Sequence, residues 1–404
     1  MMVAAPPSLL AEVDEILPGV IADRRHFHEH PELGFQEVET AKLVADRLAS
    51  LGVEDIRTGI NRTGVTGLIR GTGSGPNAGK TILLRADMDA LPIHEETGVE
   101  YASQTDGVMH ACGHDAHTAI LLGAARILSQ RRDAFAGTVK LLFQPAEEMP
   151  PGGALGMIEA GVLEEPHVDA VFGLHMANAL PVGQVAVGSG PILAGGDLFQ
   201  ITIQGKGGHA ARPQAAVDPV VIGSQIVAAL QTVVSRSVDP MESAVLSITF
   251  FKAGEAFNVI PDVATIGGTV RWFSMDVAAL VEERLIAIAE GIGAAAGAEV
   301  AVEIRKGYPP TINDAGQAEI VRQALAAVVG EENVIVPTPI MGGEDFSRFL
   351  LNRPGAFFNI GSMNEAKGLT YGHHHPKFDI DEESLGIGVA AMVQTVLTWF
   401  SHEA

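Results

Sequence analysis

The residues best suited to metal chemistry lie in residues 109–118, whose sequence is MHACGHDAHT. This segment holds three histidines, an aspartate and the single cysteine of the 404-residue chain. Thiolate and imidazole are ligands that zinc and similar divalent ions prefer, and Cys112 and His114 are close enough in sequence to face one ion. A Cys-Gly-His alone is more typical of a buried thiol beside a surface histidine, because structural zinc motifs carry more ligands. A metal site therefore depends on ligands from elsewhere in the chain.

Three apolar runs of the sequence each end in carboxylates or a histidine. They are residues 81–84, followed by Asp87 and Asp89; residues 139–143, followed by Glu147 and Glu148; and residues 168–172, followed by His175. Continuous apolar runs between helical patterns predict buried, mostly parallel strands in an α/β fold. Because ligands bind beyond the carboxyl ends of strands in open α/β sheets, we expect these polar side chains to meet at one site.

A histidine-rich loop near the end of the chain completes the predicted ligand set. Three consecutive histidines precede Pro376, and by themselves they indicate only a polar loop. The predicted ligands are Cys112, His114, Glu148, His175 and one of His373, His374 and His375. This set is large enough for two metal ions and leaves Glu147 free as a general base. A bound metal lowers the pKa of water toward roughly 7, and a nearby carboxylate can then remove its proton.

The pattern of the sequence changes near residue 198, where apolar and polar residues begin to alternate. From there the expected order is β-α-β-β-α-β, which is the ferredoxin-like split unit. Glycine- and proline-rich segments at residues 188–196 and 307–310 flank it as hinges would. We predict one discontinuous domain of residues 1–191 and 307–404, with a mixed, mostly parallel sheet, and an inserted α+β domain of residues 192–306.

The composition limits the classes of partner. Forty-nine acidic and 26 basic residues give a formal net charge of −23, and no basic stripe interrupts it. Nucleic acid and anionic membranes are therefore poor partners. The single cysteine excludes an intramolecular disulfide, and the first residues contain acids without the basic region of a secretory signal. We expect a cytoplasmic protein without a transmembrane helix, in which residues 385–400 form a core helix.

Eight motifs of the sequence together resemble a known family. They are RADMDALP, MHACGHDAHT, QPAEE, GLH, GKGGHAARP, NVIPD, GGEDFS and HHPKFDID. These motifs resemble the amidohydrolase branch of the aminoacylase and glutamate carboxypeptidase metallopeptidases, which includes hippurate hydrolase, N-acyl-amino-acid amidohydrolases and plant indoleacetyl-amino-acid hydrolases. The resemblance covers nearly the whole chain. It implies a zinc-peptidase-like catalytic domain, an inserted lid that dimerises, and two divalent ions per subunit, which are zinc, manganese, cobalt or nickel.

The resemblance also implies a role for each matching residue. The implied ligands are Cys112, His114, Glu148, His175 and His374, with Cys112 shared between the ions and Glu147 as the general base. The usual spacing before Pro376 favours His374, although the triplet leaves its two neighbours as alternatives. Asp87 and Asp89 are given supporting roles. From the inserted domain, His209 would stabilise the oxyanion, and Asn258 and Arg271 would hold the substrate carboxylate.

The implied activity is hydrolysis of the amide bond of a small N-acyl amino acid, such as an N-acetyl or N-benzoyl compound, in a homodimer or a dimer of dimers. One alternative is a carboxypeptidase or dipeptidase of the same family acting on short peptides, because it would use the same water, base and carboxylate clamp. Another alternative is a metal-binding scaffold without catalysis. The presence of Glu147 argues against the scaffold, since loss of the base would be its sign.

Overall fold

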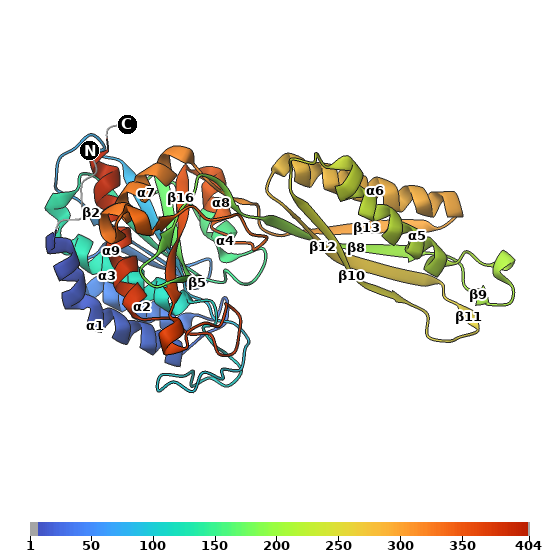
Figure 1. The fold of residues 1–404 in the computed structure, drawn as a ribbon, viewed down its shortest axis with the longest axis horizontal. Helices are drawn as coiled ribbons and strands as arrows, with labels where there is room; N and C mark the ends of the chain where they lie inside the picture. The colour runs from blue at the N-terminus through green and yellow to red at the C-terminus, as the bar shows by residue number, and fades with distance from the viewer. Residues whose placement is uncertain (1–6, 403–404) are drawn as a thin grey trace. The chain divides into compact units, whose positions relative to one another are not determined.

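A computed structural model describes residues 7–402, which form two compact units (Figure 1). The first unit comprises the chain up to Ile192, the segment Ile312–Thr338 and the chain from Asp345 onward. The second comprises Leu193–Thr311 and the short segment Pro339–Glu344. Each unit has its own hydrophobic core.

The first unit is built on an eight-stranded sheet with strand order β1-β2-β4-β3-β5-β16-β6-β15. Its strands are β1 (Glu54–Ile60), β2 (Gly64–Arg70), β3 (Thr81–Asp87), β4 (Thr138–Gln144), β5 (Ala170–Pro181), β6 (Val185–Ala186), β15 (Val334–Ile335) and β16 (Gly355–Met363). The central strands β4, β3, β5 and β16 are parallel neighbours, whereas β1, β2 and β4 pair antiparallel. β3, β4, β16 and the first half of β5 are almost entirely buried, which explains their continuous apolar sequence. The predicted α/β fold with a mixed sheet is confirmed.

Helices on the sheet of the first unit complete its core. α1 (Pro7–Glu29), α2 (Val38–Ser50), α3 (His114–Gln130), α7 (Ala315–Val329) and α9 (Glu383–Ser401) share one hydrophobic cluster with the strands, and the short helices α4 (Gly153–Glu159) and α8 (Ser347–Asn352) contact each other. Helix α1 buries Leu9, Val13, Ile16 and Val20 at helical spacing, and the same face continues to the buried Arg24.

The second unit has the predicted β-α-β-β-α-β order, with a sheet in the order β10-β12-β8-β13. Its elements are β8 (Gly195–Gln204), α5 (Pro219–Thr232), β10 (Ala244–Ala253), β12 (Val263–Trp272), α6 (Met275–Ala296) and β13 (Glu299–Lys306). Two further strands, β9 (Gly208–His209) and β11 (Val259–Ile260), pair with each other. The alternating sequence of β8 buries Phe199, Ile201 and Ile203 against the helices, as expected for a strand with one solvated face.

The boundaries of the two units differ from the predicted boundary residues 192 and 306: the second unit runs from Leu193 to Thr311 and includes one further segment. Pro339–Glu344 belongs to the second unit, where the carbonyl oxygen of Ile340 accepts a hydrogen bond from the backbone nitrogen of Ala194 at 3.1 Å. This contact joins distant parts of the sequence, so no local pattern could indicate it. The short strands β7 (Gly190–Leu193) and β14 (Thr311–Asn313) lie where the chain passes between the units.

Two helical segments of the described chain are long and apolar enough to cross a membrane by length and hydropathy alone. The segment Glu383–Ser401 is α9, and 72% of its apolar window is buried inside the first unit. It is therefore a core helix, as its sequence predicts. The segment Pro219–Ser237 comprises α5 and the π-helical residues Val233–Ser237 after it, and 28% of its window is buried.

Candidate metal centre

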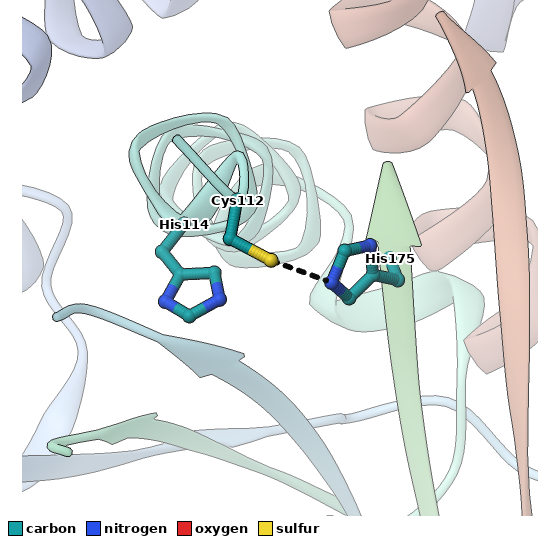
Figure 2. Close-up of side chains that lie close together, drawn as sticks. All are labelled: Cys112, His114 and His175. Atoms are coloured by element: carbon teal, nitrogen blue, oxygen red, sulfur yellow. Dashed lines mark hydrogen bonds between the residues drawn. The ribbon is translucent and has the colours of Figure 1, made fainter. Parts of the chain in front are cut away.

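Cys112 and His114 flank the start of α3, and His175 approaches them from β5 (Figure 2). Their ligand atoms lie within 4.8 Å of one another, and Sγ of Cys112 is 3.5 Å from Nε2 of His175. Gly113 adopts φ +89° as the residue before the helix, a conformation that glycine adopts without strain. His175 lies within β5, which extends further than its apolar sequence run predicts.

Cys112 also belongs to a second group, with Glu148 and His374, whose ligand atoms lie within 4.8 Å of one another. In this group, Nε2 of His374 is 3.0 Å from Oε1 of Glu148. The two groups share only the cysteine sulfur. The arrangement therefore offers two adjacent sites of three ligands each, and a site with three protein ligands leaves coordination positions for water or substrate.

The structure distinguishes the three consecutive histidines. The backbone nitrogen of His374 donates to the carbonyl oxygen of Ala111 at 2.8 Å, and its φ of +64° turns this residue toward the cluster. His373 is half-buried, with its ring 5.0 Å from that of His175, and desolvation lowers its pKa to about 2. His375 stacks on Tyr371 with ring centroids 4.4 Å apart, and lies in neither group.

Asp89 forms hydrogen bonds with the backbone of the adjacent acids Glu147 and Glu148 and with the ring of His114. Its Oδ1 and Oδ2 atoms each accept a hydrogen bond at 3.0 Å, from the backbone nitrogens of Glu147 and Glu148 respectively. Its backbone carbonyl oxygen lies 2.8 Å from Nδ1 of His114, so this nitrogen carries the proton. The other ring nitrogen of His114, Nε2, is buried and has no hydrogen-bond partner among the described residues. A buried, unpartnered imidazole nitrogen facing a thiol and carboxylates is what a metal ligand requires.

Asp87 is bonded to residues around the cluster. Its Oδ2 atom pairs with Nη1 of the buried Arg85 at 2.5 Å and lies 3.7 Å from Nε2 of His114. Its Oδ1 atom lies 2.6 Å from Nδ1 of His117. Asp87 is therefore held by Arg85 and His117, and it also forms a group with His114 and His117 whose ligand atoms lie within 4.8 Å of one another. Its supporting role stays a prediction.

Glu147 lies beside both groups and is 6% exposed. One of its carboxylate oxygens, Oε1, accepts a hydrogen bond from the backbone nitrogen of Asp345 at 3.4 Å. The Asp345 carboxylate is fixed in turn by Arg85 at 2.9 Å and by Gln144 at 2.8 Å. The base candidate therefore lies at the end of a buried hydrogen-bond network.

Protonation within the cluster fits a cation site. Burial raises the pKa of the Cys112 thiol well above its ordinary value. Burial also opposes the charged form of His114, but the negative charge of Asp87 and the bond to Asp89 outweigh it and raise its pKa. A thiol and an imidazolium are both poor ligands, and a divalent cation would displace both protons. The donor set of one thiolate, three imidazoles and one carboxylate suits zinc and neighbouring transition metals.

The remaining predicted residues belong to the second unit. His209 in β9 pairs with Val259 in β11, and the carbonyl oxygen of Asn258 accepts a hydrogen bond from the nitrogen of Ala210 at 3.1 Å. His209 and Asn258 are thus neighbours on exposed segments near the start of β12. Arg271 lies near the other end of β12, about 26 Å along the strand from Val263. Asn258 and Arg271 therefore lie apart within the second unit.

Sequence patterns missed several residues that hold the ligands. The buried Arg24 and His28 both contact Asp115, which follows His114, and Asn178 binds the histidine loop. The signal for Arg24 was available, because it continues the buried apolar face of α1 at helical spacing. For Asn178, the sequence carries no comparable signal.

Comparison with known proteins gives the chain a family. Residues 83–398 match the model of peptidase family M20/M25/M40. The chain is 42% identical to thermostable carboxypeptidase 1 of Saccharolobus solfataricus, covering 94% of this chain and 95% of that protein. It is 43% identical to N-acetyl-L-cysteine deacetylase of Bacillus subtilis, covering 94% and 87%. The crystal structure of Bacillus subtilis YXEP, described as a dinuclear metal binding peptidase of family M20, superposes with a TM-score of 0.82 at 37% identity, covering 96% and 99%.

These matches confirm the resemblance seen in the sequence motifs, and they extend over both units of the fold. Identity above 40% over nearly the whole length of enzymes supports catalysis by this chain as well. The chain is a hydrolase that belongs to the M20/M25/M40 family of peptidases.

Proposed function

We propose that this protein hydrolyses the amide bond of N-acyl amino acids with the help of two divalent metal ions. The observation that carries the proposal is the pair of three-ligand groups sharing Cys112, with Glu147 beside both. The proposed ligands are Cys112, His114, Glu148, His175 and His374. The deacetylase relative, named for an N-acetyl amino acid, supports the substrate class. Zinc or manganese is the proposed resident metal, with cobalt and nickel as substitutes, because the donor set mixes soft and hard ligands.

The bound ions would supply Lewis-acid chemistry, lowering the pKa of water and polarising the scissile carbonyl group. The chain's own contribution is proton transfer and orientation. Glu147 would take the proton from the attacking water and deliver one to the leaving amine. Its backbone nitrogen is fixed by Asp89, and its carboxylate is approached by the backbone of Asp345, so little reorganisation is needed.

The second unit would act as a lid that completes the site of a partner subunit. In this proposal, His209 donates a hydrogen bond to the oxyanion of the tetrahedral intermediate. Asn258 and Arg271 hold the substrate carboxylate, one from each chain, because they lie toward opposite ends of the β12 strand. Local cations are needed here because the protein carries a formal net charge of −23, which disfavours approach of an anionic substrate.

Dimerisation would use the β10 edge and the adjacent face of α5. β10 is an edge strand of ten residues in which Lys252 is the one charged residue. Val245 and Phe251 on this strand are exposed, as are Val220 and Val221 of α5. An apolar, unpaired edge strand is a template for pairing with another chain. This surface supports the proposed homodimer, or dimer of dimers.

The proposed location is the cytoplasm, where a reducing environment keeps the Cys112 thiol available as a ligand. The partners are small molecules, and neither nucleic acid nor membrane has a place in the proposal.

A substrate panel on metal-quantified protein tests the proposed reaction. N-acetyl and N-benzoyl amino acids are compared with dipeptides that have a free amino group, and kcat/KM is measured for each. We expect higher values for the N-acyl amino acids, with the Glu147→Gln variant as the background control. Faster cleavage of the dipeptides would contradict this proposal. It would instead support a peptidase activity like that named for the carboxypeptidase relative. Failure to cleave either class would leave a metal-binding scaffold.

A further inference from the structure

Arg24 of α1 is a fully buried arginine that joins two segments carrying proposed metal ligands. Its Nε atom donates to Oδ2 of Asp115 at 2.8 Å, and its Nη2 atom donates to Oδ1 of Asp379 at 2.7 Å. Asp115 follows His114 in the first turn of α3, and Asp379 lies in the loop that carries His374. One guanidinium group thus bridges the segments that supply a ligand to each metal group.

Both carboxylates are held by further contacts, so Arg24 lies at the centre of a buried network. His28, one turn after Arg24, reaches the same Asp115 oxygen at 2.8 Å through Nδ1. The hydroxyl group of Tyr101 donates to Oδ2 of Asp379 at 2.9 Å, and the Tyr101 ring lies 4.9 Å from the guanidinium carbon. The buried charge of Arg24 is therefore compensated on two sides, as a buried cation must be.

The loop that carries His374 needs such support because of its backbone. His374 has a φ of +64°, which a residue with a side chain adopts only where its surroundings enforce it. Asn178 provides part of that support by donating to the carbonyl oxygens of Tyr371 at 2.7 Å and Asp379 at 3.0 Å. The backbone bond from His374 to Ala111 holds the turn itself. Arg24 adds a further bond at the end of the loop by fixing the Asp379 side chain.

We propose that Arg24 is a positioning residue that sets the geometry of both metal sites from outside the ligand set. This inference rests on the proposed metal centre and adds a residue to it from α1, which lies outside the part of the chain that the family model matches. Arginine suits the role because its donors point in fixed, different directions from one plane, so it can hold two carboxylates at once. Lysine keeps the charge but presents it at a single point.

The experiment compares zinc binding by apo-protein of the wild type and three variants, using competition with a chromophoric chelator. Arg24→Lys keeps the buried charge and removes the bridge. Arg131→Lys is the matched control, because Arg131 pairs with Glu12 at 2.6 Å and so ties α1 to the end of α3 far from the ligands. Asp379→Asn removes the charge on the His374 side alone. The unfolding temperature of each apo-protein is measured in parallel.

We expect the wild type and Arg131→Lys to bind two zinc ions with equal affinity. Arg24→Lys should remain folded and bind zinc roughly 10- to 100-fold more weakly, the usual effect of losing a group that orients a ligand. Asp379→Asn should keep one tight site and lose affinity at the other.

Two tight ions in folded Arg24→Lys would overturn the positioning role, as would an equal loss of affinity in Arg131→Lys. If Arg24→Lys does not fold, the zinc affinity of Asp379→Asn becomes the test. Two tightly bound zinc ions in Asp379→Asn would contradict the inference. Failure of the wild type to bind zinc is a separate result, which would remove the proposed metal centre itself and Arg24's role with it.

Discussion

Nδ1 of His117 donates a hydrogen bond to Oδ1 of Asp87 at 2.6 Å. The direction follows from the other ring nitrogen, Nε2, which accepts a bond from the backbone nitrogen of Met176 at 2.9 Å. Both ring nitrogens of His117 therefore already have hydrogen-bond partners within the protein. His110 lies in the same motif but belongs to none of the ligand groups in the described chain. Of the three histidines in MHACGHDAHT, His114 is the one that offers a nitrogen to the cysteine.

The histidine triplet gives a prediction with an internal control. His374→Ala should reduce the metal content from two ions per chain to one, because it removes a ligand of the group with Glu148 and Cys112. His375→Ala should keep both ions, since its exposed ring stacks on Tyr371 outside the groups. Metal analysis after gel filtration measures both. Loss of an ion from His375→Ala, with two retained by His374→Ala, would move the ligand to the neighbouring position.

The adjacent acids should separate binding from turnover. Glu147→Gln is expected to keep two metal ions and lose about 10²–10⁴-fold in kcat, the usual effect of removing a general base. Glu148→Gln is the matched variant, and it should lose an ion because its side chain belongs to a ligand group. Metal content and steady-state rates are measured on the same samples. Near-normal turnover in Glu147→Gln would assign the base to another residue.

Metal affinity should rise with pH. The pKa of the Cys112 thiol is raised by burial, and that of His114 is raised mainly by Asp87 against the effect of burial. Both groups hold a proton at neutral pH in the metal-free protein, and binding must release it. We expect the apparent association constant for zinc to increase at least about tenfold per pH unit between roughly pH 6 and 8.

Calorimetric titration in buffers of different ionisation enthalpy counts the released protons for this test. In Cys112→Ser the number of protons released on zinc binding should fall by about one. A serine hydroxyl group binds as a neutral ligand, and more weakly than a thiolate. An affinity that does not change with pH would mean that neither group is displaced from its protonated form.

Mixing two inactive variants tests whether His209 serves the partner subunit. His209→Ala should fold and bind metal, yet lose about 10²–10³-fold in turnover through loss of an oxyanion donor. When His209→Ala and Glu147→Gln chains exchange, a heterodimer would contain one site with both defects and one intact site. Activity should therefore reappear on mixing. Heterodimers without recovered activity would show that His209 acts in its own subunit or has no catalytic role.

Local patterns in the sequence were sufficient for the fold class and for the order of the main elements. Buried parallel strands have continuous apolar sequences, and the half-solvated β8 strand has an alternating sequence. The periodicity of apolar residues therefore predicts the strands of both units. The proximity of Glu148 and His175 to the cluster could be anticipated because each lies after or within such a run. Asp89, in contrast, binds backbone groups of residues 58 and 59 positions away, and no side-chain pattern reports those bonds.

The histidine triplet and the arginine of α1 show the same limit. The backbone turn at His374, rather than residue type, separates it from His373 and His375. Arg24 reaches Asp379 across 355 positions, a pairing that depends on how α1 packs on the rest of the first unit. Spacing predicts which residues share an element; it cannot predict which distant elements meet.

The shared sulfur has a consequence for the lifetime of the enzyme. Cys112 belongs to both ligand groups, so oxidation of its sulfur atom would remove a ligand from both proposed metal sites at once. The chain contains no second cysteine to trap a sulfenic acid as an internal disulfide. Inactivation by peroxide should then follow a single exponential without a half-active intermediate, and recovery would depend entirely on an external thiol.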